Sequence, residues 1–181
     1  MISDQILDRK VQVLLELRGY KLLSREEVKE GEFLTVEGRR GKKILIWAIT
    51  DVETIGIRFI NLLSKKVESQ ELDSGIIISN GRFTYSAKAN SKKKRVELIP
   101  PNFPSFNIFD HHLVPKHEIL SSEEKESVLK KYRVQPYQLP LLRTSDPISK
   151  VIGARAGDLV KITRQSLTAG EHISYRYVVE G

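Results

Sequence analysis

Acidic side chains at the ends of an apolar run are the first residues of this sequence that could do chemistry. Glu37 and Asp51 flank residues 44–49. Nucleases with such acids hold a divalent metal, and they also need an acid and a lysine, two residues apart, within the next strand. Residues 44–49 offer neither. We therefore expect no metal site and no catalytic site here.

Cysteine and histidine limit the remaining chemistry. The chain has no cysteine, which excludes disulfides, thiolate nucleophiles and cysteine-based zinc sites. His111, His112 and His117 lie close in sequence and are of a type that binds zinc. However, Pro115 interrupts the segment and no fourth ligand is evident, so packing and hydrogen bonding are the favoured roles. We expect no metal and no cofactor.

Basic residues give the chain its formal net charge of +7 and a pI near 9.5, which favours approach to phosphate backbones. The candidates for contact with DNA phosphates form two groups: Arg39, Arg40 and Lys42, and Lys92, Lys93, Lys94 and Arg95. Such contacts carry no sequence readout. A solvated basic loop is the alternative for the second group. The single Trp and 7% aromatic content argue against a platform for stacking single-stranded bases.

The first half of the chain predicts a mixed sheet with helices against it. Apolar spacing predicts a helix over residues 3–18, ended by Gly19. Ser24 and Glu27 predict a capping box that opens a brief turn, and Asp51 is expected to cap a helix over residues 52–67. The β-rich runs are residues 33–37, 43–49, 75–79 and 96–99. This order resembles the core shared by restriction endonucleases and Holliday junction resolvases.

A domain boundary is expected after Pro100 and Pro101, which gives domains 1–101 and 102–181. In the second domain, Ser121 and Glu124 form the capping box of one helix, and Asp146 and Pro147 open another that Gly153 ends. Residues 158–164 and 172–179 alternate as the strands of a hairpin. The fold class is therefore α+β: a nuclease-like α/β domain followed by a small α+β domain with a β-hairpin.

The second half closely resembles the C-terminal assembly module of the archaeal RNA polymerase H subunit, the counterpart of the fifth shared subunit of eukaryotic polymerases. The residues that carry the resemblance run in order from His112 to Arg176: His112-Leu113-Val114-Pro115-Lys116-His117-Glu118, Leu139-Pro140, Asp146-Pro147, Gly153, Gly157-Asp158-Leu159-Val160-Lys161-Ile162, Arg164, Ser166, Ala169-Gly170 and Tyr175-Arg176. For the first half, the resemblance is one of element order and position only.

The resemblance implies a structural, non-catalytic subunit of DNA-directed RNA polymerase. It implies that the second domain docks on the largest subunit, with the other polymerase subunits around it. The docking candidates are Leu139, Pro140, Asp146, Pro147, Arg164, Tyr175 and Arg176. The first domain would then be a degenerate nuclease-like jaw near downstream duplex DNA, with backbone contact at most.

The expected location is the cytoplasm beside the nucleoid if the source is archaeal, and the nucleus if it is eukaryotic. No membrane association is expected, because no run of about 18 apolar residues occurs. Two alternatives stay open: a metal-dependent nuclease or resolvase that uses Glu37 or Asp51, and a stand-alone DNA-binding adaptor.

Overall fold

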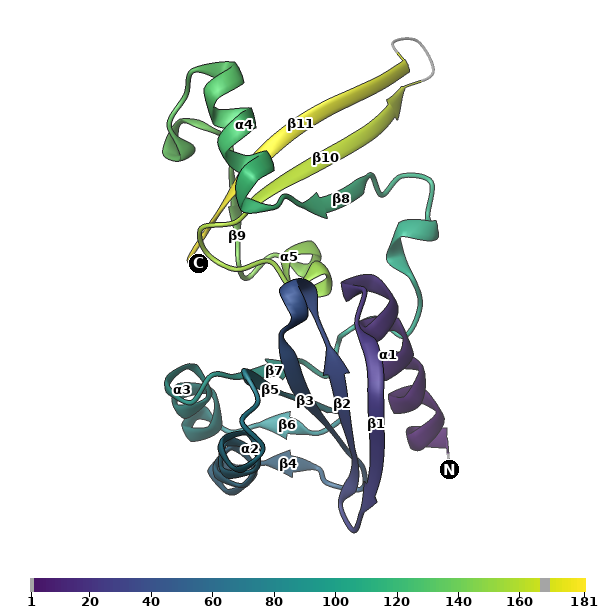
Figure 1. Cartoon of the computed structure of the whole chain (residues 1–181). Coiled ribbons are helices and arrows are strands. Elements are labelled where there is room, and N and C mark those ends of the chain that lie inside the picture. The colour runs from purple at the N-terminus through teal and green to yellow at the C-terminus, as the bar shows by residue number, and fades with distance from the viewer. Residues whose placement is uncertain (1, 167–169) are drawn as a thin grey trace. The chain divides into compact units, whose positions relative to one another are not determined.

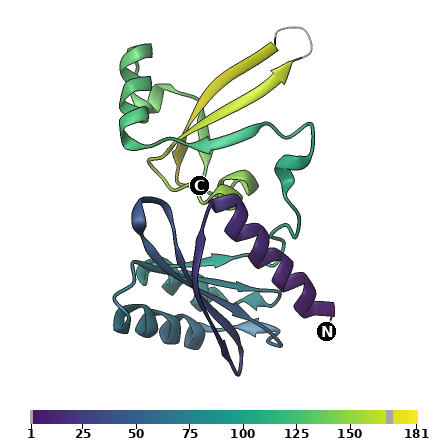
Figure 2. The same ribbon diagram turned by 45° about the vertical axis from the view of Figure 1, so that its right-hand side comes forward.

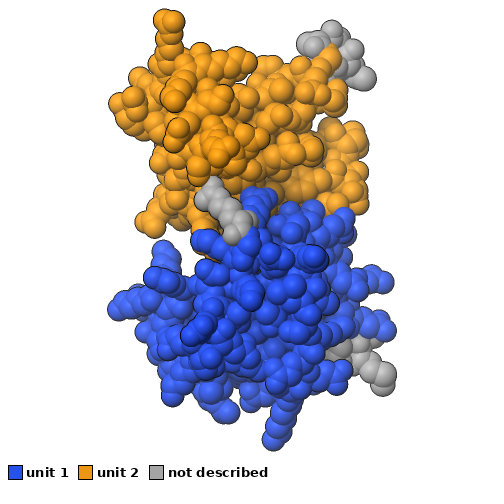
Figure 3. Space-filling model, in the orientation of Figure 1, with its two compact units in different colours: residues 1–106 blue, residues 107–181 orange. Residues whose placement is uncertain are grey.

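The chain forms two compact units in a computed structural model, residues 1–106 and 107–181 (Figure 3). The structure describes residues 2–166 and 170–181, and the side chains of residues 2–4, 40 and 166 lie outside what it describes. The compact units divide after residue 106, five residues beyond the expected division. The domain boundary after residue 101 stays a prediction. None of the helices in the described ranges is long and apolar enough to cross a bilayer.

A five-stranded mixed sheet forms the centre of unit 1 (Figure 1). Its strands, in spatial order, are β1 (Lys21–Val28), β2 (Gly31–Glu37), β3 (Lys43–Ile49), β5 (Ser74–Ser79) and β7 (Val96–Ile99). The first three strands are antiparallel neighbours, whereas β3, β5 and β7 run parallel. A smaller parallel pair joins β4 (Thr54–Ile55) and β6 (Arg82–Phe83). The hairpin predicted from residues 33–37 and 43–49 is therefore confirmed.

Helices cover both faces of this sheet, with α1 (Ile2–Arg18) on one face and α2 (Ile57–Ser69) and α3 (Tyr85–Lys93) on the other (Figures 1 and 2). The central strand β3 is buried from Ile44 onward because each of its faces meets a helical layer. Leu45 and Trp47 pack with Phe59 and Leu63 of α2 in one apolar cluster. The residues of β3 that alternate with these, such as Ile46, point to the face that α1 covers.

Two sequence predictions in unit 1 are wrong. Ser24 and Glu27 open no turn, because they lie within β1, which pairs with β2 over its whole length apart from one irregularity near Leu22. Asp51 caps no helix, because its backbone has a φ of 56° and α2 begins at Ile57 after the short strand β4. In both places strand pairing outweighs a local capping signal: the β1–β2 hairpin at Ser24 and Glu27, and the pairing of β4 with the distant β6 after Asp51.

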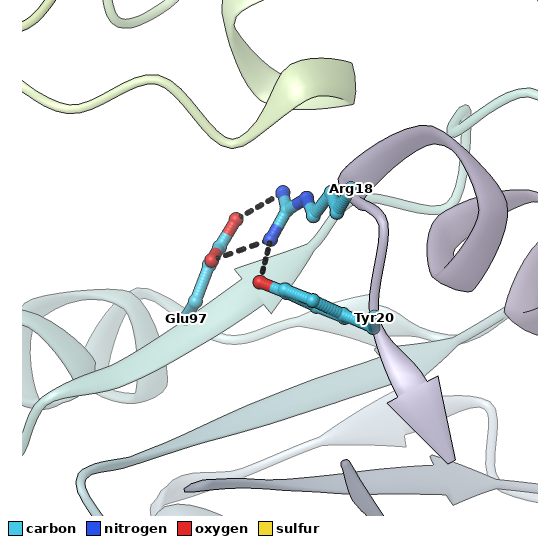
Figure 4. A network of polar contacts seen from close by, with 3 residues as sticks. All are labelled: Arg18, Tyr20 and Glu97. Atoms are coloured by element: carbon cyan, nitrogen blue, oxygen red, sulfur yellow. Dashed lines mark hydrogen bonds and ion pairs between the residues drawn. The ribbon is translucent and has the colours of Figure 1, made fainter. Parts of the chain in front are cut away.

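A buried ion pair fastens the end of α1 to the edge strand β7 (Figure 4). Arg18 is 3% exposed, and its two terminal nitrogens donate to the carboxylate of Glu97 at 2.9 and 2.6 Å. The Tyr20 hydroxyl lies 3.5 Å from the same guanidinium. Burial by itself would lower the pKa of Arg18, but the charge and hydrogen bonds of Glu97 and then Tyr20 raise it. Arg18 therefore remains charged on the buried face of α1, which also carries Lys10.

Replacing Glu97 with Ala should lower the free energy of unfolding of unit 1 by about 2 kcal/mol, because Arg18 loses its carboxylate while it stays buried. The double variant Arg18→Met/Glu97→Leu should recover most of that loss, since an apolar pair of similar size needs no desolvation of charge. Urea unfolding followed by Trp47 fluorescence measures this in unit 1. Equal stability of Glu97→Ala and the unaltered chain would contradict it.

Unit 2 is built on a four-stranded sheet, whose strands in spatial order are β8 (Lys116–Ile119), β10 (Leu159–Ser166), β11 (Gly170–Val179) and β9 (Leu141–Arg143). The β10–β11 hairpin is confirmed, with its tip at residues 167–169 outside the described part. β8 and β9 were not predicted, because strands of four and three residues leave no periodic pattern in the sequence. The buried cluster comprises Leu142, Ile152, Val160, Ile162 and Val178.

The helices of unit 2 begin and end as their sequence predicts. Ser121 and Glu124 form a reciprocal capping box at the start of α4 (Ser122–Tyr132). Asp146 accepts from the Ile148 amide at 2.8 Å and so caps α5 (Pro147–Ile152). Gly153 ends α5 with a φ of 71°, in the left-handed region that glycine adopts without strain. Three short 3-10 turns, η1 (Arg39–Gly41), η2 (Ile108–Asp110) and η3 (Pro136–Gln138), complete the described elements.

Candidate docking and nucleic-acid surfaces

The two groups of basic residues named from the sequence lie at one edge of the unit 1 sheet. β3, β5 and β7 are parallel, so the residues that precede them gather at the same edge. The Asp73 amide donates to the Lys43 carbonyl at 2.9 Å, and the Gly75 amide donates to the Arg95 carbonyl at 3.2 Å. Strands are spaced about 4.8 Å apart, so β3 and β7 lie about 10 Å apart. We call this edge, with its exposed cations, the basic edge.

The described side chains of the basic edge are exposed to solvent: Arg39, Lys42, Lys43, Lys92, Lys93, Lys94 and Arg95. Sequence reasoning missed Lys43, because it was assigned only to the strand. The Lys94 ammonium donates to Asn61 of α2 at 2.7 Å, which holds it near the helix. Arg40 lies in η1, but its side chain is outside the described ones. Two acids also lie at this edge: Asp73, whose carboxylate accepts from the Lys43 amide at 2.9 Å, and Glu37, which lies opposite Lys43.

The acids named as nuclease candidates do not come together. Glu37 ends β2 opposite Lys43, the first residue of β3, whereas Asp51 follows the last residue of β3. The two ends of a strand of this length lie about 20 Å apart. Glu37 and Asp51 therefore cannot hold one metal ion. Within the described residues, no three His, Cys, Asp or Glu side chains form a group that could hold a metal.

A different acid, Glu32, is the buried carboxylate of the sheet. It is 8% exposed, and its Oε2 accepts from Nε of Arg25 on the neighbouring strand. Its other oxygen, Oε1, is buried without a hydrogen-bond partner. The hydrogen bond with Glu32 raises the pKa of Arg25, and the charge of Asp8 on α1 adds to this effect. The guanidinium of Arg25 therefore pairs with the buried carboxylate of Glu32.

In unit 2, three of the seven docking candidates gather around His117. His117 pairs with Ile162 of β10, and Arg176 pairs with Val160, so these residues share the face that carries the buried cluster. Arg164 lies on the same face two residues beyond Ile162. The pKa of His117 is lowered overall, chiefly by burial. The hydrogen bond to Pro115 and the charge of Asp146 act to raise this pKa, whereas the charges of Arg164 and Arg176 lower it further. We call Asp146, Arg164, Arg176 and His117 the charged face.

The histidines of the segment serve local packing in this structure. The His117 Nδ1 donates to the Pro115 carbonyl at 2.7 Å, and its ring lies 6.0 Å from that of Phe109. The rings of His111 and His112 stack at 4.8 Å, and the His111 Nδ1 accepts from the Leu113 amide. These contacts orient the segment that leads into β8.

The other docking candidates lie elsewhere on unit 2. Tyr175 pairs with Lys161 on the opposite face of the sheet, and its ring lies 5.8 Å from that of Tyr132 on α4. Leu139 and Pro140 immediately precede β9, and the Pro140 carbonyl accepts from the Tyr177 amide at 2.9 Å. Pro147 is the first residue of α5. The candidates therefore occupy two faces of the sheet and one end of it.

Comparison with known proteins follows the same division into units. Residues 106–178 match the family model described as RNA polymerase Rpb5, C-terminal domain. The DNA-directed RNA polymerase subunit Rpo5 of Pyrococcus horikoshii is 56% identical over 75 residues, which cover 41% of this chain and 92% of that protein. The chain belongs to the Rpo5 family. A family resemblance found in the sequence of the second half is thereby confirmed.

A eukaryotic relative of the Rpo5 family matches over a longer stretch. The DNA-directed RNA polymerases I, II, and III subunit RPABC1 of Caenorhabditis briggsae is 35% identical over 129 residues, 69% of this chain and 61% of that protein. Unit 2 ends at Gly181 and begins at Asn107, so an alignment of this length extends into unit 1.

Unit 1 matches a second family model. Residues 7–103, more than half of the chain, match the family model described as NACHT-associated inactive Restriction Endonuclease 1, and unit 1 belongs to that family. The predicted restriction-endonuclease-like fold of the first domain is therefore confirmed. Among solved structures, EndoMS in apo form is 19% identical with a TM-score of 0.39 and covers 45% of this chain and 38% of that chain.

His117 should make unit 2 less stable as pH falls. Its pKa is lowered in the folded unit from the ordinary 6.5, chiefly by burial, so below about pH 6.5 the unfolded chain takes up a proton that the folded unit resists. The contribution of the neutral His117 to the stability of unit 2 is therefore complete above about pH 6.5 and declines as the pH falls below it. Hydrogen exchange of β10 peptides, corrected for intrinsic rates, measures it at pH 7.5 and 5.5. His117→Gln should reduce the difference; an unchanged difference would contradict the assignment.

Proposed function

We propose that this chain is a non-catalytic structural subunit of DNA-directed RNA polymerase. Unit 2 docks on the largest subunit, and unit 1 forms part of the lower jaw near downstream duplex DNA. The observation that carries the proposal is the 56% identity to an archaeal Rpo5 across 92% of that protein. Relatives named as polymerase subunits occur in both archaea and a eukaryote.

The composition of unit 2 supports a docking role. Seven apolar side chains are buried among the described residues of unit 2, and several large apolar side chains stay exposed, including Tyr137 at 73%, Leu141 at 51% and Ile173 at 38%. A small domain with exposed apolar side chains gains stability when these are buried on a partner. β10 and β11 also extend beyond their pairing with β8 and β9, so the outer part of the hairpin presents both faces.

The charged face supports a specific orientation of docking. Arg164 is exposed and Arg176 is half-buried, and both lie on the face where Asp146 caps α5. Guanidinium groups at an interface form bidentate pairs with carboxylates, which fix the register of two surfaces. We therefore infer that the largest subunit contributes acidic side chains opposite Arg164 and Arg176.

The double variant Arg164→Glu/Arg176→Glu of the full chain should bind the largest subunit at least about tenfold more weakly than the unaltered chain. Lys130→Glu/Lys131→Glu on α4 makes the same change in net charge on exposed residues and is the matched control. Surface-immobilised largest subunit with purified full-length variants measures the affinities. A further variant, Tyr175→Ala, alters the opposite face of the sheet. If both charge-reversal variants weaken binding equally, or if only Tyr175→Ala weakens it, the docking surface is not the charged face.

The basic edge supports contact of unit 1 with duplex DNA. Seven exposed cations lie over strands that span about 10 Å, a length of duplex that carries about six phosphates. The acids Asp73 and Glu37 also lie at this edge, but they are outnumbered by the seven exposed cations. Backbone contact without sequence readout is the interaction that such an edge can make.

Reversing two charges of the basic edge, Lys42→Glu/Lys93→Glu, should reduce the salt dependence of DNA binding by the assembled polymerase. The slope of log affinity against log salt should fall by about 2, since each phosphate contact contributes about 0.9. Arg58→Glu/Lys65→Glu changes the net charge equally at another exposed site of unit 1 and should leave the slope unchanged. An unaltered slope in the first variant would remove the basic edge from the DNA-binding surface.

A further inference from the structure

A groove of about 630 Å³ opens in unit 1 between α2 and the turn that joins β1 to β2. Its apolar walls are Val28, Phe33, Trp47 and Leu62. Leu62 is 43% exposed although it belongs to an amphipathic helix, where a leucine on the sheet side would be buried. It stands at the rim, so the groove offers one accessible apolar side chain over an aromatic floor.

Four cations surround these apolar walls: Lys29 from the turn and Arg58, Lys65 and Lys66 from α2. The Lys66 ammonium lies 3.9 Å above the Phe33 ring and 2.6 Å from Glu26. The one acid that lines the groove is Glu30, which Arg58 approaches to 3.8 Å. The described lining residues therefore carry an excess of positive charge, although Arg58 and Lys66 each lie near an acid.

The indole nitrogen of Trp47 lies beneath this wall and is not accessible to a ligand in the groove. Trp47 is 3% exposed, and its Nε1 is buried without a hydrogen-bond partner. An unsatisfied buried donor is costly in a folded protein. The accessible donors of the groove are those of its lysines and Arg58, and Glu30 is the acid among its described lining residues, so the groove suits a ligand rich in acceptors.

The length of the groove indicates an extended ligand. The lining residues of α2 run from Arg58 through Leu62 to Ser69, which are on one face of the helix at spacings of three and four. The eleven helical steps from Arg58 to Ser69 rise about 16 Å, which matches about five residues of extended peptide. A stacked nucleobase fits poorly, because Phe33 is 9% exposed, Trp47 is 3% exposed and Lys66 covers the Phe33 ring.

We propose that this groove binds an acidic segment of a partner protein that places a bulky apolar side chain against Leu62 and its carboxylates against Arg58, Lys65 and Lys29. The groove lies on the α2 face of unit 1, and none of its lining residues belongs to the basic edge. DNA contact at the basic edge and peptide binding in the groove therefore use separate sets of residues.

The chain's single Trp is Trp47, so its fluorescence reports occupancy of the groove directly. The probe is a short synthetic peptide of Asp and Glu around a central pair of leucines, without aromatic residues. Titration into the full-length chain should shift Trp47 emission and saturate. The same peptide with Ser in place of Leu, the same with Lys in place of the acids, and oligothymidylate serve as comparison ligands.

Arg58→Glu/Lys65→Glu should weaken peptide binding by about tenfold, since two exposed attractive pairs become repulsive. Leu62→Ser should also weaken binding, whereas Lys42→Glu/Lys93→Glu, with the same change in net charge, should not. All of the replaced side chains are exposed, so each variant should fold, and circular dichroism checks that its secondary structure is unchanged. Equal binding of the serine peptide, equal weakening by both charge pairs, tighter binding of oligothymidylate, or no binding would each overturn the proposal.

Discussion

The pairing of β10 with β8 on one side and β11 on the other is the constraint on which the charged face depends. Side chains of a strand alternate between two faces, so a shift of one residue would exchange every inward and outward side chain. The observed register places His117 beside Ile162 and Arg176 beside Val160. The same backbone hydrogen bonds between strands therefore decide which apolar side chains join the buried cluster and which basic side chains lie on the charged face.

Unit 1 uses strand order in the same way, but for a different surface. The parallel run of β3, β5 and β7 brings residues 42–43 and 92–95 to one edge, although about 50 residues separate them in sequence. The nuclease-like frame keeps a buried acid, Glu32, and pairs it with Arg25. The nuclease-like frame fixes where these side chains lie, whereas function resides in a site and not in a fold.

The sequence predicted those features that depend on local chemistry. The capping box at Ser121, the cap at Asp146 and the apolar strand β3 all follow from side-chain type and spacing. The start of α2 and the short strands β8 and β9 depend on partners distant in the chain, and β1 depends on its hairpin partner β2, whereas local signals at Ser24 and Asp51 pointed elsewhere. For the same reason, the sequence named Arg164 and Arg176 without showing that they join His117, and it missed the groove at Trp47.

Residence in a polymerase assembly is the central claim, and the elution of the chain from native lysate tests it most directly. Size-exclusion chromatography of a native lysate of the source organism, probed with antibodies to this chain and to the largest polymerase subunit, separates a bound subunit from a free protein of 20.7 kDa. The account predicts that the chain elutes with the largest subunit and that little of it is free. Elution mainly as the free protein, with intact polymerase in fractions that lack it, would contradict the account.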